Sequence, residues 1–245
     1  MRTLRWAFAL GLVLLVGGVS FADEAGVKPL KVVMYSGSAE YNSAESLAGF
    51  KKHLEEQYGA VCSLHVVDEK GTTLKGIDEL ETCDVAVIFT RRLKLDEGQV
   101  ARLKKYCDAG KPIVGIRTAS HAFQTWLEFD KDVIGGNYKG HYKENEPAEV
   151  KLAQGNHPVL NGVSTFPTLG KLYKNPDIAE DVTRLLVATT GEASEPVAWV
   201  RTHRGGRVFY TSLGVPEDFK RSDFRRLLVN AVYWTAKRGT PKPRE

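Results

Sequence analysis

Three short apolar runs constrain most strongly what this chain can fold into. They are residues 30–35 (LKVVMY), 85–90 (VAVIFT) and 112–116 (PIVGI). A strand with one wet face alternates polar and apolar residues, whereas a strand buried on both faces is a continuous apolar run. Such doubly buried strands occur in parallel sheets that helices cover on both sides. The runs therefore predict an α/β fold.

Helical patterns separate these runs. Apolar side chains recur at helical spacing over 47–58, and Gly59 ends that pattern. A second helix is predicted to open at Asp96, with Gln99 three residues later as in a capping box, and to end at Gly110. The alternation with short connections is typical of a doubly wound, flavodoxin-like, mostly parallel sheet with helices on both faces.

The second half of the sequence is less regular and predicts an antiparallel extension of the same sheet. A final helix is expected over 222–237. The hairpin turn is expected at residues 203–206, between two alternating segments. The additional predicted strands are 61–67, 148–152, 185–189, 197–201 and 207–211.

The first 22 residues resemble a secretory signal peptide. Arg2 and Arg5 precede an apolar run, and small residues, Ser20 and Ala22, occupy the −3 and −1 positions of a cleavage site. Cleavage predicts a periplasmic or secreted protein with no stable membrane anchor; an uncleaved anchor is the alternative. One domain is expected over 23–237, followed by a flexible tail over 238–245.

The charge of the chain argues against a nucleic-acid partner. The formal net charge is +4, and loss of the two arginines in the leader would leave +2. Nucleic-acid binding needs a concentrated basic stripe, and the positive charges here are dispersed. A small-molecule ligand is therefore expected.

The carboxyl ends of the parallel strands are the expected place for a ligand site, because doubly wound folds bind ligands there. Several polar or small residues follow the first, third and fourth strands. Those predicted to bind substrate are Ser36, Gly37, Glu40, Arg91 and Ser120.

A sharp turn is predicted where the fourth strand ends, at residues 115–119. It has the outline of a nucleophile elbow, but Arg117 stands where a Ser or Cys nucleophile would be. A guanidinium cannot attack, yet its fork of donors suits carboxylates or clustered sugar oxygens. His121 follows and could transfer a proton. Alternatively, Arg117 pairs with Glu128 or Asp130, and His121 caps a helix.

Two further segments are predicted to border the site. A glycine-rich stretch over 135–142 carries Asn137, Tyr138 and His141, and a second rim carries Lys171 and Tyr173. His141 is expected to share a pocket with His121 and to exchange protons with it near neutral pH. The histidine spacing fits no compact metal motif, so neither a metal nor a cofactor is expected, with metal binding the minority alternative.

The three cysteines lie where no nucleophile is expected. Cys62 and Cys83 precede or begin strands, and Cys107 ends a helix that has returned to the opposite edge of the sheet. An oxidising compartment would permit a disulfide, for which Cys83 with Cys107 is the expected pair.

Several short motifs follow one another along the chain: Gly115-Ile116, 135–141 (GGNYKGH), 156–163 (NHPVLNGV), Leu172-Tyr173, 195–199 (EPVAW), 206–214 (GRVFYTSLG) and 224–226 (FRR). Their order resembles the ThuA-like (trehalose-utilization) family over essentially the whole mature chain. Family members commonly carry Gly-Ile-His-Ser at the elbow, where Arg117-Thr118 stands here. They also carry an acidic residue two before the Tyr of the Leu-Tyr pair, where Lys171 stands.

The resemblance implies the class I glutamine-amidotransferase-like fold without its cysteine chemistry, and a link to disaccharide metabolism. Three functions remain open. The chain could be an isomerase, lyase or hydrolase of a sugar or keto-disaccharide, with Arg117, His121 and His141 as catalytic residues. It could instead be a non-catalytic carbohydrate-binding or accessory domain, or a structural remnant of the amidotransferase fold.

Overall fold

A single mixed sheet forms the centre of the molecule. The computed structural model describes residues 28–67, 71–143, 147–153, 155–191 and 193–244. In these residues nine strands follow the order β2-β1-β3-β4-β9-β8-β7-β5-β6. The parallel half comprises β2 (Val61–Val66), β1 (Lys31–Gly37), β3 (Val85–Thr90), β4 (Ile113–Ile116) and β9 (Gly206–Thr211). The antiparallel half continues through β8 (Ala193–His203), β7 (Thr183–Thr190), β5 (Ala148–Leu152) and β6 (Phe166–Thr168).

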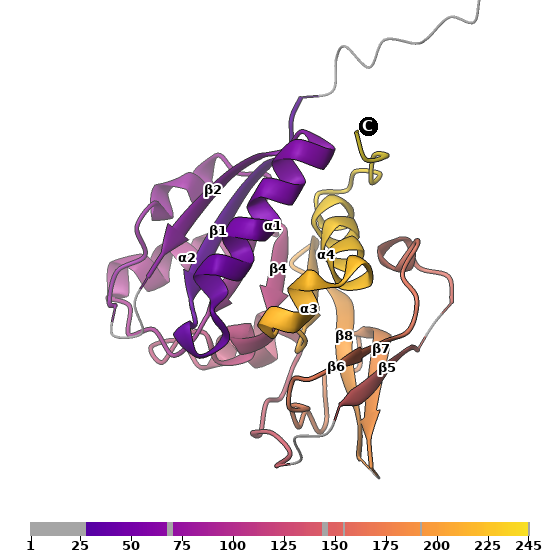
Figure 1. The fold of residues 1–245 in the computed structure, drawn as a ribbon. Helices are drawn as coiled ribbons and strands as arrows, with labels where there is room; N and C mark the ends of the chain where they lie inside the picture. Colours follow the sequence, from indigo (N-terminus) through magenta and orange to yellow (C-terminus); the bar gives the residue numbers. More distant parts are fainter. Residues whose placement is uncertain (1–27, 68–70, 144–146, 154, 192, 245) are drawn as a thin grey trace, which may run out of the picture.

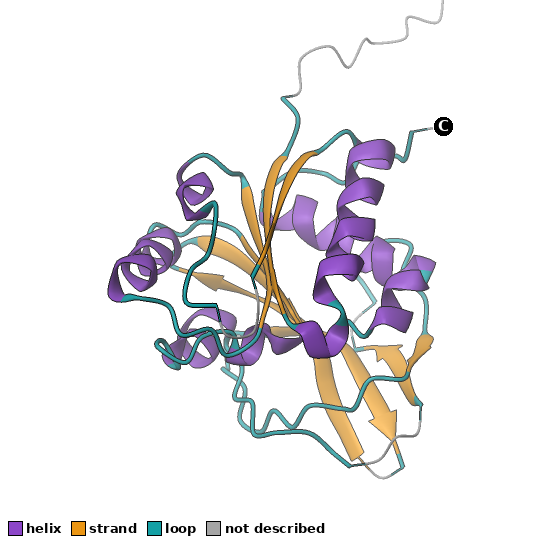
Figure 2. Ribbon diagram, turned by 60° about the vertical axis from the view of Figure 1, so that its left-hand side comes forward, coloured by secondary structure: helices purple, strands orange, loops and turns teal. Residues whose placement is uncertain are grey.

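Helices cover both faces of the parallel half (Figures 1 and 2). The helices α1 (Ser43–Tyr58), α3 (Pro216–Lys220) and α4 (Ser222–Thr235) pack on one face, and α2 (Glu97–Asp108) packs on the other. Short helical turns complete the description: η1 (Ala39–Tyr41), η2 (Ile77–Glu81), η3 (Arg117–His121), η4 (Phe129–Ile134) and η5 (Pro158–Leu160).

The sequence of strand β1 is apolar throughout because both of its faces are covered. Val32 and Met34 belong to the core under α1 and α4, whereas Val33 and Tyr35 belong to the core under α2. Both sets of side chains are buried because the sheet has no wet face here. The predicted α/β fold with an antiparallel extension is thus confirmed.

Local signals in the sequence also have their expected structures. Asp96 Oδ1 accepts a hydrogen bond from the Gln99 backbone N–H at 2.8 Å, so the predicted helix cap is present. Strands β7 and β8 are longer than predicted, and β6 and α3 were not predicted. The predicted signal peptide lies outside the described residues. In the predicted tail, the Arg244 backbone N–H donates to the Gln57 carbonyl at 2.8 Å.

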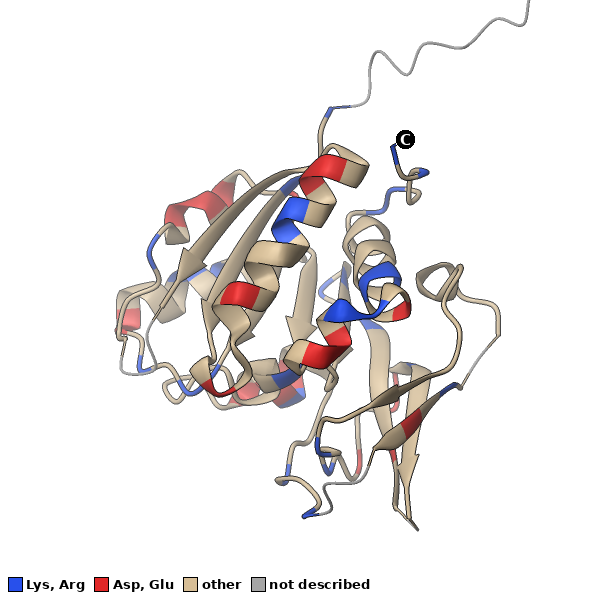
Figure 3. Ribbon diagram, viewed as in Figure 1, with Lys and Arg blue, Asp and Glu red and all other residues tan. Residues whose placement is uncertain are grey.

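The charge distribution and the lengths of the helices bear on possible partners. Figure 3 shows acidic and basic residues interspersed along the described part of the ribbon rather than sorted into a basic stripe. Within that same part of the chain, no helix is both long and apolar enough to span a bilayer.

The cysteines are free thiols, so the expected disulfide between Cys83 and Cys107 is wrong. Cys83 Sγ lies 3.8 Å from the Tyr106 hydroxyl, and the Cys107 side chain is on the buried face of α2. Burial raises the pKa of Cys83 to about 11, and those of Cys62 and Cys107 to about 12. These protonated, enclosed thiols are poor nucleophiles.

Candidate functional site

The turn after β4 has the sharp geometry expected of an elbow. Arg117 adopts a left-handed backbone conformation with φ +46°, which is uncommon for a residue other than glycine. The Tyr210 hydroxyl donates a hydrogen bond of 2.8 Å to the Arg117 carbonyl and holds this turn. Gly214 approaches from β9's carboxyl end, where an added Cβ would lie 2.7 Å from Ile116 Cγ2. The predicted elbow is therefore present, with arginine at its apex.

The Arg117 side chain is buried and held between aromatic rings. It is only 1% exposed, and its Nη1 donates to the Ser212 carbonyl at 2.7 Å. The guanidinium carbon lies 4.1 Å from the Tyr41 ring centre and 4.8 Å from that of Tyr173. A Cβ at Gly170 would lie 3.0 Å from Nη1, so glycine permits this close approach. The guanidinium that was expected to offer its donors to a ligand is therefore enclosed within the protein and does not face an open cleft.

The positive charge of Arg117 has no carboxylate in direct contact within the described part of the chain. Among the described residues it forms no ion pair with Glu128 or Asp130, the partners considered from sequence, and its Nε has no hydrogen-bond partner. Burial alone would lower the pKa of Arg117, but Tyr173, Tyr41 and Asp218 together hold it above its usual value. Arg117 remains a cation whose surroundings are mainly aromatic.

His121 and two tyrosines form a stacked cluster above this arginine. The His121 ring stacks on Tyr138, with ring centres 4.4 Å apart and planes at 17°. Tyr173 lies 5.9 Å from His121 and 4.6 Å from Tyr138, measured between ring centres. Ser120 Oγ is 3.1 Å from His121 Nδ1 and orients the imidazole. We call His121, Tyr138 and Tyr173 the aromatic cluster.

The imidazole in this cluster is neutral at physiological pH. Burial, followed by the nearby Arg92, Arg91 and Arg117, lowers the pKa of His121 to about 3. A cation beside three arginines in a poorly hydrated place is disfavoured on both counts. His121 can thus hydrogen-bond a ligand through a neutral ring, but it is a weak base.

A cleft of about 450 Å³ opens beside the aromatic cluster. Its wall includes Asp130, which the sequence suggested only as a partner of Arg117. Asp130 is 9% exposed, and its Oδ2 accepts the Tyr138 backbone N–H at 2.8 Å. Burial raises the pKa of Asp130 to about 6, so this carboxyl titrates near neutral pH. The residues lining the cleft are 120–131 other than Gln124 and Thr125, together with Asn137, Tyr138 and Lys139.

One sequence signal could have identified Asp130. A Cβ placed on Gly136 would collide with Asp130 Oδ1, and Gly136 does not have a positive φ. The second residue of the Gly135-Gly136 pair therefore has no side chain because the carboxyl group approaches its backbone. A paired glycine six residues after an acidic residue is a usable but weak indication of that contact.

The residues predicted to bind substrate after β1 and β3 mainly contact one another and neighbouring elements at the carboxyl edge of the sheet. Ser36 Oγ lies 2.7 Å from Ser43 Oγ and joins β1 to α1. Gly37 packs closely against Thr90, where an added Cβ would be 3.3 Å from the Thr90 side chain. Glu40 and Arg91 form an ion pair at 3.1 Å.

The structure does not bring His141 into contact with His121. The His141 side chain is exposed, and its Nδ1 donates to the neighbouring Tyr142 carbonyl at 2.8 Å. Only its backbone reaches the aromatic cluster, through a strand-like bridge to Tyr173. Proton exchange between the two imidazoles therefore has no contact to support it.

Two other predicted binding residues lie at the margins. Asn137 borders the cleft but donates its Nδ2 hydrogen to the Pro176 carbonyl at 2.7 Å, and Lys171 is half-buried beside Leu172. In the part of the chain that the structure describes, no three His, Cys, Asp or Glu side chains are grouped to hold a metal ion.

Comparison with known proteins places these features in a family. The family model ThuA, described as trehalose utilisation, matches residues 31–235. A search of curated proteins found no match. A ThuA-like protein from Parabacteroides merdae has 19% identity and a TM-score of 0.70, covering 88% of this chain and 93% of that one.

Two other solved structures show the same fold. A ThuA-like protein from Bacteroides uniformis has 20% identity and a TM-score of 0.69, covering 87% of this chain and 94% of that one. A glutamine amidotransferase from Thermotoga maritima has 14% identity and a TM-score of 0.53, covering 86% and 100%. With the family model matching most of its length, the chain belongs to the ThuA family.

Proposed function

We propose that this chain is an exported enzyme that acts on a sugar or an oxidised (keto-)disaccharide at the aromatic cluster. The stacked His121–Tyr138 pair beside the cleft is the observation that carries the proposal. Ring faces offer apolar contact to the C–H groups of a sugar, and the polar edges of His and Tyr can hydrogen-bond its hydroxyls. The family description, trehalose utilisation, agrees with a disaccharide.

In this proposal His121, Asp130 and Arg117 have different roles in the reaction. Neutral His121 hydrogen-bonds a hydroxyl or carbonyl oxygen, and Asp130, whose pKa is about 6, is the group suited to gain or lose a proton near neutral pH. Arg117 acts indirectly, because its guanidinium is buried behind Tyr41 and Tyr173. It holds these phenols in place and polarises them. Isomerisation, elimination and hydrolysis all need such proton transfer.

Export is part of the proposal and rests on the sequence of residues 1–22. The basic start, the apolar run and the small residues before the cleavage site favour a periplasmic or secreted protein. Comparing the mass of the mature protein from a culture fraction with that of residues 23–245 tests this point.

A non-catalytic carbohydrate-binding domain is the second candidate. Asp130 Oδ1 has no hydrogen-bond partner among the described residues and is shielded from solvent. A ligand in the cleft therefore cannot reach Oδ1, and Oδ2 already accepts the Tyr138 backbone N–H, which suits binding better than proton transfer. Binding without turnover would favour this candidate.

The test is a turnover assay of the purified protein with trehalose, maltose and their keto derivatives, followed by carbon NMR. We expect conversion of at least one keto-disaccharide, with its loss in His121→Gln. His203→Gln, a histidine at the hairpin between β8 and β9, is the matched control and should retain conversion. If no member of the panel is bound or converted, the proposed function is wrong.

A further inference from the structure

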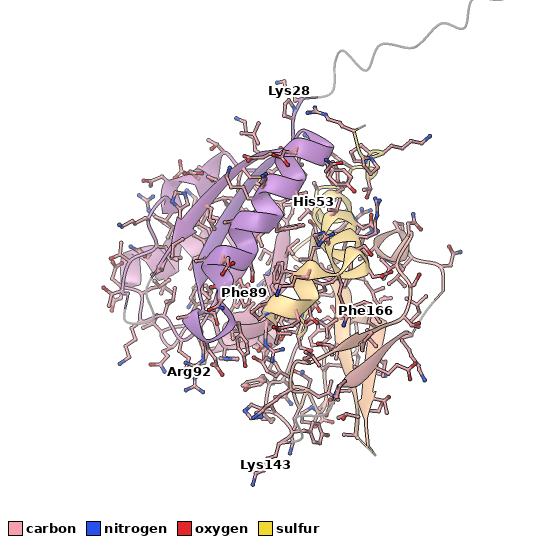
Figure 4. All side chains as sticks on the ribbon, viewed as in Figure 1. Lys28, His53, Phe89, Arg92, Lys143 and Phe166 are labelled. Atoms are coloured by element: carbon pink, nitrogen blue, oxygen red, sulfur yellow. The ribbon has the colours of Figure 1, made fainter. Side chains whose placement is uncertain are left out.

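Two arginines that follow β3 are fixed to the rim of the site. The Arg91 backbone N–H donates to the Gly37 carbonyl at 3.0 Å, and the Arg92 N–H donates to the His121 carbonyl at 2.8 Å. Arg92 has a left-handed φ of +51° and is exposed. Figure 4 shows Arg92 at the end of the molecule opposite Lys28, which is the carboxyl edge of the parallel strands.

Among the described residues, the arginines of this edge differ in their acidic partners. Glu40 offsets Arg91 through their ion pair at 3.1 Å. Arg92 forms no ion pair in the described residues, and neither does the buried Arg117 beneath the aromatic cluster. Burial opposes the charge of Arg117, but Tyr173, Tyr41 and Asp218 offset that cost, whereas Arg92 has its guanidinium exposed at the rim.

Two carboxyls are buried near these arginines, and each also accepts backbone hydrogen bonds. Asp218 accepts hydrogen bonds from the Gly214 and Val215 backbone N–H groups at 2.8 and 3.1 Å, and burial raises its pKa. Asp130 accepts the Tyr138 N–H and faces Lys139, which offsets its charge when it is ionised. Burial is the main cause of the lowered pKa of His121, and Arg92, Arg91 and Arg117 lower it further, so these three cations act on the aromatic cluster.

We propose that the sugar bound at this site carries a carboxylate, which lies beside Arg92 while the sugar ring packs on Tyr138 and His121. The ligand class is a uronic acid or another sugar acid, free or as a glycoside. The inference rests on the proposed carbohydrate function and adds the charge of the substrate. A guanidinium suits a carboxylate through two parallel N–H donors.

Calorimetric titration with two matched probes tests the inference. Methyl glucuronide and methyl glucoside differ only at the carboxylate, and acetate at the same ionic strength controls for anion binding alone. We expect the glucuronide to bind at least about tenfold more tightly than the glucoside, as for one charge-assisted hydrogen bond. Arg92→Gln should reduce that ratio towards one. The control Arg102→Gln, an exposed arginine of α2, should leave it unchanged.

Proton–nitrogen NMR of the His121 imidazole tests whether the probe binds beside this ring. Glucuronide bound at Arg92 should raise the pKa of His121, because it adds negative charge beside the ring, whereas the glucoside should not. Equal affinity for both probes contradicts the anionic substrate and leaves the proposed carbohydrate function standing. Acetate binding as tightly as the glucuronide also contradicts it, since the sugar would then not matter. If neither probe nor trehalose binds, the proposed function fails as well.

Discussion

The carboxyl and amino edges of the parallel sheet bury polar groups in opposite ways. At the amino edge, the Tyr106 hydroxyl donates to the Pro112 carbonyl at 2.7 Å, and protonated Cys83 and Cys107 pack in the core. At the carboxyl edge, Arg117 is a buried cation that forms no ion pair with any residue the structure describes, and His121 loses its basicity. The buried groups of the amino edge are neutral, whereas at the carboxyl edge burial opposes the charge of Arg117, which Tyr173, Tyr41 and Asp218 offset, and removes that of His121.

The difference between the two edges indicates that the functional site lies at the carboxyl edge. A neutral thiol loses little when it is buried, whereas a charged or titratable group keeps a large electrostatic cost. Such costs are typical of functional sites, because a ligand can relieve them. Substitutions at the carboxyl edge should therefore have larger effects than substitutions at the amino edge.

Removing the Arg117 side chain should have the largest effect on stability. Arg117→Ala leaves a cavity between Tyr41 and Tyr173 and an unpaired Ser212 carbonyl, so we expect the free energy of unfolding to fall by about 3–5 kcal/mol. Arg184→Ala, at an exposed position of β7, should change it by less than about 0.5 kcal/mol. Equal small losses in denaturant titrations of both variants would show that Arg117 is not an organising residue.

Acid should destabilise the wild type through His121. The pKa of His121 is about 3 in the folded state against 6.5 for the free side chain, so only the unfolded state takes up the proton between these values. Stability is therefore complete above pH 6.5 and falls by about 3 kcal/mol from pH 7 to pH 4 through this residue. His121→Gln should remove that contribution, and His203→Gln should alter the slope less. Identical pH slopes in the wild type and His121→Gln would contradict the buried neutral imidazole.

Asp130 should change the free energy of unfolding with pH in the opposite direction to His121. Its pKa is about 6 in the folded state against 3.8 for the free side chain, so the folded state holds the proton more tightly. This raised pKa favours folding most below pH 3.8, and that advantage is lost as the pH rises through 6.

Asp130→Asn keeps an acceptor for the Tyr138 N–H but cannot ionise. Relative to the wild type, it should gain about 2 kcal/mol between pH 4 and pH 7. Lys139 and Tyr210 also face this carboxyl, so both are left unchanged in the comparison. A constant difference between the two proteins across that range would contradict the raised pKa.

The smallest effect is expected at the amino edge. Cys107→Ala removes one buried sulfur atom and should cost about 1 kcal/mol of stability, with no change in sugar binding. In the wild type, thiol reagents should react slowly under native conditions, because burial raises the pKa of Cys107 to about 12. Rapid labelling of the folded protein would overturn the description of this edge as inert.

The sequence was most informative where local pattern and burial coincide. The apolar runs predicted β1, β3 and β4. The alternation of strands with helices predicted the sheet edge at which Arg117 and His121 lie. In contrast, β6 has only three residues and is defined by its pairing with β5, which no local pattern encodes.

The detailed arrangement of the site depends on residues far apart in the chain. Arg117 is enclosed by Tyr41, Tyr173 and Ser212, which come from three other segments. Spacing could place Arg117 at an elbow but could not indicate that its side chain turns inward. Similarly, His141 and Tyr138 are close in sequence, but only Tyr138 stacks on His121.

The most direct test of the account is the affinity for keto-trehalose of two variants, one from each edge. Tyr138→Leu removes the ring that stacks on His121, and Cys107→Ala alters the opposite edge. We expect the dissociation constant to rise at least about tenfold for Tyr138→Leu, in keeping with loss of an aromatic stacking contact, and to stay within about twofold of wild type for Cys107→Ala. Unchanged binding in folded Tyr138→Leu, or loss of binding in Cys107→Ala, would contradict a ligand site at the carboxyl edge.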